Sequence, residues 1–191
     1  MIKIAILGDI GSGKSYVANK FGYPVFNADL EVSKIYKNDK IFFIKLKKKL
    51  PKYFQSFPIK KRDVIRAILG NRISLKIITK IIHPEIRKKM NLFIKKNRKK
   101  EIVILDIPLY LENKLNKKKD ILIFIKSKKE EINKRLRNRK NFDFVLLKKF
   151  KKIQLPLEIK KKHSNFVIKN NFTNKSLKKD IKRILKIIKN K

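Results

Sequence analysis

Apolar residues follow two patterns along the chain, short continuous runs and longer segments with helical spacing. Five short runs have the length and composition of buried strands: residues 2–7, 23–28, 102–105, 121–125 and 166–168. Helical spacing is found over residues 14–21, 127–139 and 174–191, and it dominates residues 30–90. Strands that alternate with helices are typical of a parallel sheet with helices on both faces. The pattern therefore predicts a three-layer α/β fold with a five-stranded parallel sheet.

Residues at the carboxyl ends of the predicted strands are the first candidates for a functional site, because parallel sheets bind ligands beyond these ends. Gly8 follows the first strand, Asp29 the second and Asp106 the third. We expect these three positions to lie along one edge of the sheet.

The octapeptide from Gly8 to Ser15 matches the phosphate-binding pattern G-x-x-x-x-G-K-[ST] in full, between a predicted strand and a predicted helix. Its glycines let the backbone turn tightly and direct N–H groups at phosphate oxygens. In such loops the lysine, here Lys14, reaches the β- and γ-phosphates, and the Ser15 hydroxyl binds Mg²⁺. The pattern predicts a P-loop NTPase fold that binds ATP with Mg²⁺. The expected ATP contacts are Gly11, Ser12, Gly13, Lys14, Ser15 and Tyr16.

The two aspartates at strand ends each have a functional and a structural interpretation. As a base, Asp29 would accept the proton of an attacking hydroxyl group; as a structural residue, it would cap the helix that starts at Leu30. Asp106 would act on Mg²⁺ through water, because this ion keeps much of its hydration, or it would cap the next turn. Position alone leaves both roles open for Asp29, whereas the phosphate loop favours the metal role for Asp106.

Arg135, Arg137 and Arg139 end the helix predicted from Ser127, whose side chain is expected to cap it. On a helix, Arg135 and Arg139 share a face, and arginine binds phosphate oxygens in a planar, bidentate manner. One interpretation is a lid over residues 135–155 that brings an arginine to the transferring phosphoryl group. The other is a solvated basic helix, in a chain with 54 Lys and Arg residues.

Composition limits the remaining possibilities. The 191 residues suit one compact domain, and the absence of cysteine excludes disulfides and cysteine-bound metals. No apolar run reaches the ~18 residues that a membrane span needs, so we expect a cytoplasmic protein with no membrane partner, monomeric or weakly self-associating. The net charge of +39 indicates either a nucleic-acid surface or a lysine-rich composition, and its even spread along the chain favours the second explanation.

Several segments occur in an order that resembles one enzyme family. They are Leu7–Ser15, Val25–Asp29, Ile82–Ile86, Leu105–Glu112, Lys134–Arg139, Gln154 and Asn165–Asn171. They are similar, in turn, to the Thr-Gly-Gly-Ile-Gly-Ser-Gly-Lys-Ser loop, the Val-Ile-Asp-Ala-Asp segment, the His-Pro element, the Asp-x-Pro-Leu-Leu-x-Glu motif, the Lys-Arg-x-x-x-Arg lid, a glutamine and the Ala-Asp-x-Val-Ile-x-Asn segment of dephospho-CoA kinases. The set covers nearly the whole chain, so the sequence is identified as a member of this family.

The resemblance implies a reaction and roles for several residues. ATP would phosphorylate the ribose 3′-hydroxyl of dephospho-CoA, giving ADP and CoA, the last step of coenzyme A synthesis. Asp29 would be the base, and Lys14 and Arg139 would be the other catalytic residues. Arg135 and Asn170 would contact ATP, the latter near its adenine.

The resemblance also implies how the chain is organised. A core of residues 1–29 and 100–191 would carry a helical acceptor-binding region over residues 30–95, together with the lid. The acceptor contacts would be Asp29, His83, Arg87, Pro108 and Leu109. For His83 a structural role at the start of a helix is the alternative.

Four positions depart from the family's pattern. Asp9 replaces a loop glycine, and Asn27 and Asn165 replace aspartates. Lys140 follows Arg139 where the family has Asp or a similar residue. The departures bear on acceptor affinity and the lid more than on the class of reaction.

Two rival functions remain open at this stage. One is another small-molecule kinase of the same architecture, acting on nucleosides or nucleotides. The other is a basic nucleic-acid-binding protein with a degenerate ATP site, which would need a cationic face with exposed aromatics. Phe21, Phe26 and Phe124 instead occupy positions typical of a core.

Overall fold

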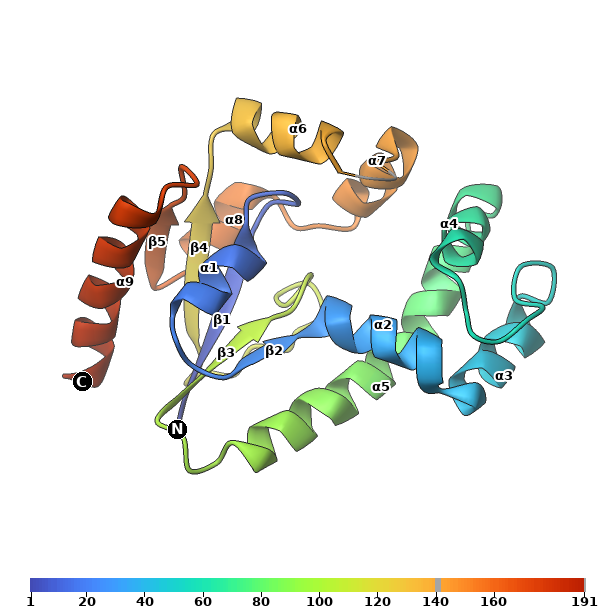
Figure 1. Ribbon diagram of the computed structural model, residues 1–191, viewed down its shortest axis with the longest axis horizontal. Coiled ribbons are helices and arrows are strands. Elements are labelled where there is room, and N and C mark those ends of the chain that lie inside the picture. Colours follow the sequence, from blue (N-terminus) through green and yellow to red (C-terminus); the bar gives the residue numbers. More distant parts are fainter. Residues whose placement is uncertain (140–141, 191) are drawn as a thin grey trace. The chain divides into compact units, whose positions relative to one another are not determined.

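The computed structural model describes residues 1–139 and 142–190. Within these residues, parallel strands form one five-stranded sheet in the order β2-β3-β1-β4-β5, as Figure 1 shows. The strands are β1 (Ile2–Gly8), β2 (Val25–Asn27), β3 (Ile102–Asp106), β4 (Ile121–Lys126) and β5 (Phe166–Lys169). The predicted α/β class with a parallel sheet is confirmed.

Successive side chains of a strand point to opposite faces of the sheet. Because consecutive residues of β1 and β3 are buried, both faces of the sheet are covered. Ile4 and Ile6 of β1 are fully buried and belong to a core cluster with helices α1 (Lys14–Lys20) and α9 (Asn174–Lys189). On the other side, α8 (Leu157–Lys162) packs against β1. Burying one such apolar side chain stabilises the fold by roughly 1.5–3 kcal/mol, so these runs hold the three layers together.

The chain divides into two compact units. The first comprises residues 1–27, 97–142 and 151–191 and contains the sheet, and the second comprises residues 28–96 and 143–150. Helix α6 (Lys129–Arg137) belongs to the first unit, whereas most of α7 (Phe144–Lys152) belongs to the second. In the described part of the chain, no helix is both long and apolar enough to cross a membrane.

The second unit is built from helices that pack around α5 (Ser74–Lys96). These are α2 (Ala28–Asn38), α3 (Lys40–Lys49) and α4 (Lys61–Gly70). Helix α5 buries Ile78, Ile82 and Ile86, spaced by four residues, because that spacing places them on one face of the helix. The Lys149 ammonium of α7 donates hydrogen bonds to the Ile68 and Leu69 carbonyls at the end of α4, which attaches α7 to this unit.

Three local predictions need correction. Strand β2 ends at Asn27, so Asp29 lies in the first turn of α2 rather than at a strand end. Ser127 does not cap α6; the N-cap is Lys128, and the Ser127 hydroxyl donates to the Ser12 carbonyl instead. Helix α6 ends at Arg137 because the chain leaves the helix at Asn138, so Arg139 does not share a helical face with Arg135. Lys140 lies outside the described residues.

Candidate active site

The phosphate loop occupies the carboxyl end of the central strand. β1 ends at Gly8 and α1 begins at Lys14, and Gly13 between them has a φ of 85°. A Cβ atom at Gly13 would lie 2.5 Å from Asn170 Nδ2, so both the backbone angle and the available space require glycine there. Lys14 Nζ donates to the Asp9 carbonyl over 2.8 Å, which folds the lysine across the loop.

Two side chains that follow neighbouring strands form hydrogen bonds to the backbone of the loop. Asn170 Nδ2 and Ser127 Oγ donate to the same acceptor, the Ser12 carbonyl, over 2.9 and 3.0 Å. Asn170 is 2% exposed, and its Oδ1 accepts a hydrogen bond from the Phe172 backbone N–H. Asn170 therefore supports the phosphate loop directly. Its contact with adenine stays a prediction, and the structural role of Ser127 had no signal in the sequence.

Asp106 ends β3 directly opposite Asn27, the last residue of β2. Asn27 Nδ2 donates to Asp106 Oδ2 over 2.7 Å, and Asp106 is 3% exposed. The Ser15 hydroxyl, in the first turn of α1, belongs to an exposed residue. A carboxylate and a hydroxyl are oxygen donors of the kind that Mg²⁺ prefers in proteins, so Asp106 and Ser15 fit the expected metal role.

Arg135 and Phe172 form a stacked pair at the edge of the sheet. The Arg135 guanidinium lies 4.1 Å from the centre of the Phe172 ring, a cation–π contact. A cavity of about 630 Å³ opens beside Asn170 and Asn171, between the starts of α6 and α9. Its volume is ample for a nucleotide base. No sequence signal had pointed to Phe172.

Pro108 and Leu109 follow β3 in a sharp turn. Together with Gly8 and Lys14, they line one narrow cavity. Leu109 has a φ of 58°, which is unusual for a residue with a bulky side chain. The turn therefore places the two predicted acceptor residues beside Lys14 of the phosphate loop.

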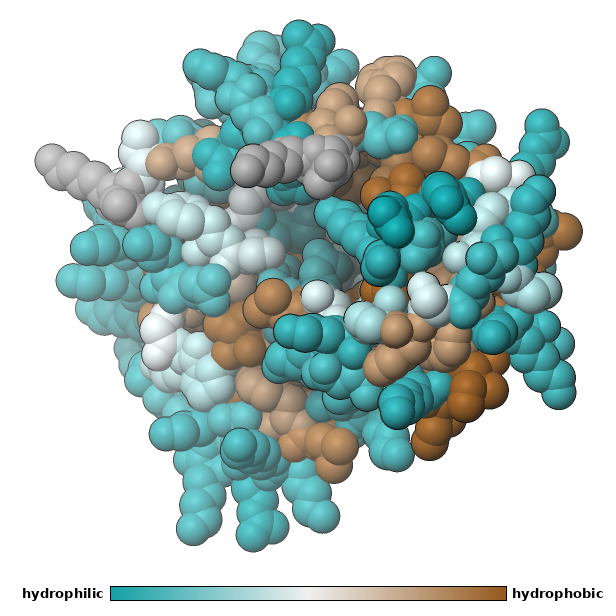
Figure 2. Space-filling model, turned by 45° about the vertical axis from the view of Figure 1, so that its right-hand side comes forward, coloured by the Kyte–Doolittle hydropathy of each residue, from teal (hydrophilic) through white to brown (hydrophobic). Residues whose placement is uncertain are grey.

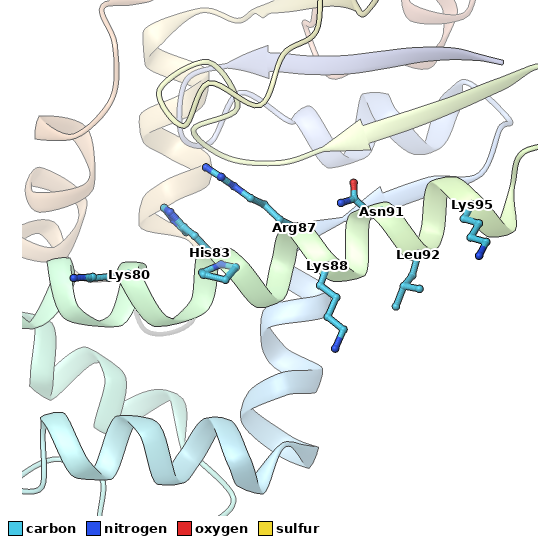
Figure 3. Close-up of a pocket in the computed structure, with 8 residues that line it drawn as sticks. Lys80, His83, Arg87, Lys88, Asn91, Leu92 and Lys95 are labelled. Atoms are coloured by element: carbon cyan, nitrogen blue, oxygen red, sulfur yellow. The ribbon is translucent and has the colours of Figure 1, made fainter.

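In the second unit, α5 carries a basic cavity of about 670 Å³. His83, Arg87 and Asn91 point to one side of the helix in Figure 3, as their spacing of four residues requires. The partial burial of His83 and the nearby charge of Arg87 lower the pKa of its imidazole. A neutral imidazole beside a guanidinium provides hydrogen-bond donors for an anionic ligand.

The predicted site residues thus divide between the two units. The first unit contains the phosphate loop, Tyr16, Asp106, Pro108, Leu109, Arg135, Arg139 and Asn170, and the second contains Asp29, His83 and Arg87. Tyr16 is half-buried in α1 and packs against the core, and Arg139 is exposed beyond the end of α6.

Besides Asn27, which bonds to Asp106, two further departures from the family pattern have a visible structural role. Asp9 Oδ1 accepts a hydrogen bond from the Ile10 backbone N–H over 2.7 Å, which stabilises the turn of the loop. Asn165 Oδ1 accepts from the Leu122 N–H over 2.8 Å, as an aspartate oxygen would.

The fold and site define a P-loop kinase: they combine a parallel sheet, a glycine-rich loop directly after β1 and Asp106 at the end of β3. The model of the dephospho-CoA kinase family matches residues 2–176. The chain therefore belongs to the dephospho-CoA kinase family. Such an enzyme transfers phosphate from ATP to dephospho-CoA, and the family match favours this activity over a nucleoside or nucleotide kinase and over a nucleic-acid-binding protein.

Individual relatives agree with this assignment. A dephospho-CoA kinase of Wolbachia pipientis wMel is 30% identical over 187 residues, which is 95% of each chain. The crystal structure of TT1252 from Thermus thermophilus has a TM-score of 0.76 at 26% identity and covers 98% of this chain and 97% of its own. Dephospho-CoA kinase from Campylobacter jejuni has a TM-score of 0.62 at 22% identity, covering 97% and 96%, and shows the shared fold.

Proposed function

We propose that this chain transfers the γ-phosphoryl group of ATP to the ribose 3′-hydroxyl of dephospho-CoA, with Asp29 as the base and Mg²⁺ as the metal. The observation that carries the proposal is the phosphate loop, which Ser127 and Asn170 hold at the end of β1. A rigid loop of this kind stabilises the charge that develops on the transferring group, and phosphoryl transfer depends almost entirely on such positioning and electrostatics.

On the ATP side, the backbone N–H groups of Gly11 to Ser15 bind the phosphates. Lys14 Nζ exchanges its carbonyl partners in the loop for phosphate oxygens. The base of ATP occupies the cavity beside Asn170. Arg135, which packs on the Phe172 ring, also contacts ATP.

Ser15 and Asp106 hold the metal ion, Asp106 through water. A bound Mg²⁺ neutralises negative charge on the phosphates. Asn27 keeps the Asp106 carboxylate oriented through its hydrogen bond.

On the acceptor side, Asp29 takes the proton of the attacking hydroxyl. Only Ala28 separates it from Asn27, the end of β2. Helices α2 to α5 bind the acceptor, and the basic cavity with His83 and Arg87 suits its phosphate groups, because arginine binds phosphate in a bidentate manner. Residues 135–155 close as a lid in which Arg139 stabilises the transferring group.

We further propose that the protein acts in the cytoplasm as a monomer or weak homo-oligomer, with no membrane or nucleic-acid partner. The acceptor and ATP are polyanions, and the positive field of the chain attracts them.

The test is ADP release with ATP and Mg²⁺ in the presence of dephospho-CoA, nucleosides, nucleoside monophosphates or no acceptor. We expect strong stimulation by dephospho-CoA alone, with CoA as the product, and no turnover by a folded Lys14→Ala variant. Stimulation by another acceptor would keep the phosphate chemistry and overturn the acceptor. Unchanged activity of Lys14→Ala would overturn the role of the phosphate loop.

A further inference from the structure

The turn after β3 contains a strained residue that the proposed mechanism leaves unexplained. Leu109 has a φ of 58°, in the left-handed region that non-glycine residues rarely adopt. Pro108 before it has a fixed φ and restricts Ile107 as well. Such strain persists only where the surrounding structure enforces it, and it concentrates at functional sites.

A buried ion pair three residues later anchors this turn. Lys160 Nζ of α8 lies 2.7 Å from Glu112 Oε1, and their side chains are only 4% and 10% exposed. The same carboxylate oxygen accepts a hydrogen bond from the Leu155 backbone N–H over 3.0 Å. Glu112 therefore joins the turn after β3 to α8 and to the end of the predicted lid segment.

Stability alone does not explain why Glu112 and Lys160 are buried as an ion pair. Removing two charges from water costs several kcal/mol per ion, and apolar residues of similar size often serve stability equally well. A second pair on α8, Glu158 with Lys161, shows the contrast: its charges are 3.9 Å apart and the Glu158 side chain is 88% exposed. A buried pair kept at such cost indicates a requirement for geometry.

The pair and the strained residue also surround one cavity. Its lining includes Glu112 and Lys160 together with Gly8, Lys14 and Leu109. A change in the position of Glu112 is therefore transmitted to the turn that faces the phosphate loop.

We infer that Glu112 and Lys160 are positioning residues for the acceptor, which hold Pro108 and Leu109 in the binding conformation beside Lys14. The inference rests on the proposed function, in which Pro108 and Leu109 contact the acceptor. Neither charged residue touches the reacting atoms. Their effect is to keep the turn preorganised, so that acceptor binding does not have to order it.

The experiment measures KM for dephospho-CoA, KM for ATP and Tm in wild type, Glu112→Gln, Lys160→Gln and a Glu112→Leu/Lys160→Met double variant. The apolar pair fills the same space without buried charge but leaves the Leu155 N–H without its acceptor, so we expect it to fold with a Tm a few degrees below that of wild type. In all three variants KM for the acceptor should rise by roughly 5- to 30-fold. This factor corresponds to the free-energy cost of keeping one non-glycine residue in the left-handed conformation, which acceptor binding would then have to supply. KM for ATP should change by less than about two-fold.

Glu158→Gln and Lys161→Gln are the matched controls, since they remove the exposed pair from the same helix. Both should leave KM for either substrate unchanged. A double variant with normal acceptor KM would overturn the inference and make the pair structural. A selective rise in KM for ATP would also overturn it, because Lys160 would then serve the phosphates. If wild type ignores dephospho-CoA, the proposed function fails instead, and the same comparison is made with the acceptor that it does use.

Discussion

Asp106 is almost completely buried, and its Oδ2 accepts a hydrogen bond from the Asn27 amide over 2.7 Å. A carboxylate at position 27, which the family pattern has, would face Asp106 with a second negative charge. The amide instead donates a hydrogen bond to Asp106 and so limits the rotation of its carboxylate. At the scale of single residues, Asn27 thus orients the carboxylate that we propose as a metal ligand.

Replacing Asn27 by alanine removes this donor. We expect the Mg²⁺ concentration for half-maximal activity to rise by roughly 10-fold or more, as for other residues that orient a metal ligand. A Mg²⁺ titration of activity, supported by Mn²⁺ binding measured directly, checks the change. Asn190→Ala, at the exposed end of the chain, is the control, and identical titrations for the two variants would contradict the role of Asn27.

Asp29 is the residue on which the proposed chemistry depends most. Asp29→Asn keeps the shape of the side chain but cannot accept the proton of the acceptor hydroxyl. We expect kcat to fall by roughly 100-fold or more, with the fold intact, because general base catalysis contributes at least that factor. Steady-state kinetics and circular dichroism test this, and a rate within a few-fold of wild type would leave Asp29 a structural role in the first turn of α2.

At the scale of elements, the ends of β4 and β5 converge on the phosphate loop that follows β1. β1 pairs with β4, and β4 with β5, in parallel register, so their carboxyl ends lie on the same edge. Ser127 after β4 and Asn170 after β5 therefore reach the same carbonyl, that of Ser12. The glycines allow the conformation of the loop, and the two bonds from the strand ends hold it there.

Asn170→Ala tests this support. The variant leaves the Phe172 N–H without the buried oxygen it donates to and takes one donor from the Ser12 carbonyl. We expect a loss of about 1–3 kcal/mol in the free energy of unfolding and a higher KM for ATP. Urea denaturation and kinetics measure both, with Asn190→Ala, at an exposed position remote in sequence from the loop, as the control. Equal stability of the two variants would show that the bonds of Asn170 do not hold the loop.

At the scale of the whole molecule, the net charge of +39 dominates. Figure 2 shows hydrophilic side chains over most of the visible face, with apolar patches between them. Fifteen acidic residues cannot pair 54 basic ones, so the compact state carries a substantial self-repulsion.

Salt should therefore stabilise this protein. Raising the ionic strength from about 0.01 to 0.15 M shortens the screening length from roughly 30 to 8 Å, and we expect Tm to rise by at least about 2–4 °C, equivalent to ~1 kcal/mol. Thermal unfolding in NaCl and in sodium sulfate at equal ionic strength measures the effect. Equal shifts indicate screening alone, and a larger shift in sulfate indicates an added effect specific to that anion. A Tm independent of salt would contradict the prediction.

The sequence alone was sufficient to predict features that depend on residues close together along the chain. The apolar runs predict each strand to within about two residues, because a buried parallel strand must be continuously apolar. The phosphate loop was evident because its glycines, lysine and serine act at fixed spacing within one turn. The ordered motifs were enough to identify the family, which the family model confirms.

Only the tertiary structure reveals the hydrogen bonds and ion pairs between segments that are distant in the sequence. The assignment of Ser127 as a cap was wrong, because its hydroxyl donates to the carbonyl of Ser12, 115 positions away, and local propensity does not reveal such a partner. The assignment of Arg139 to a helical face was wrong because α6 ends at Arg137. The pairing of Asn27 with Asp106 and of Glu112 with Lys160 also depends on strand order and on the packing of α8. The chain by itself determines the phosphate loop, because the spacing of its residues is local. The fold determines what orients that loop, because its partners meet only once the sheet has formed.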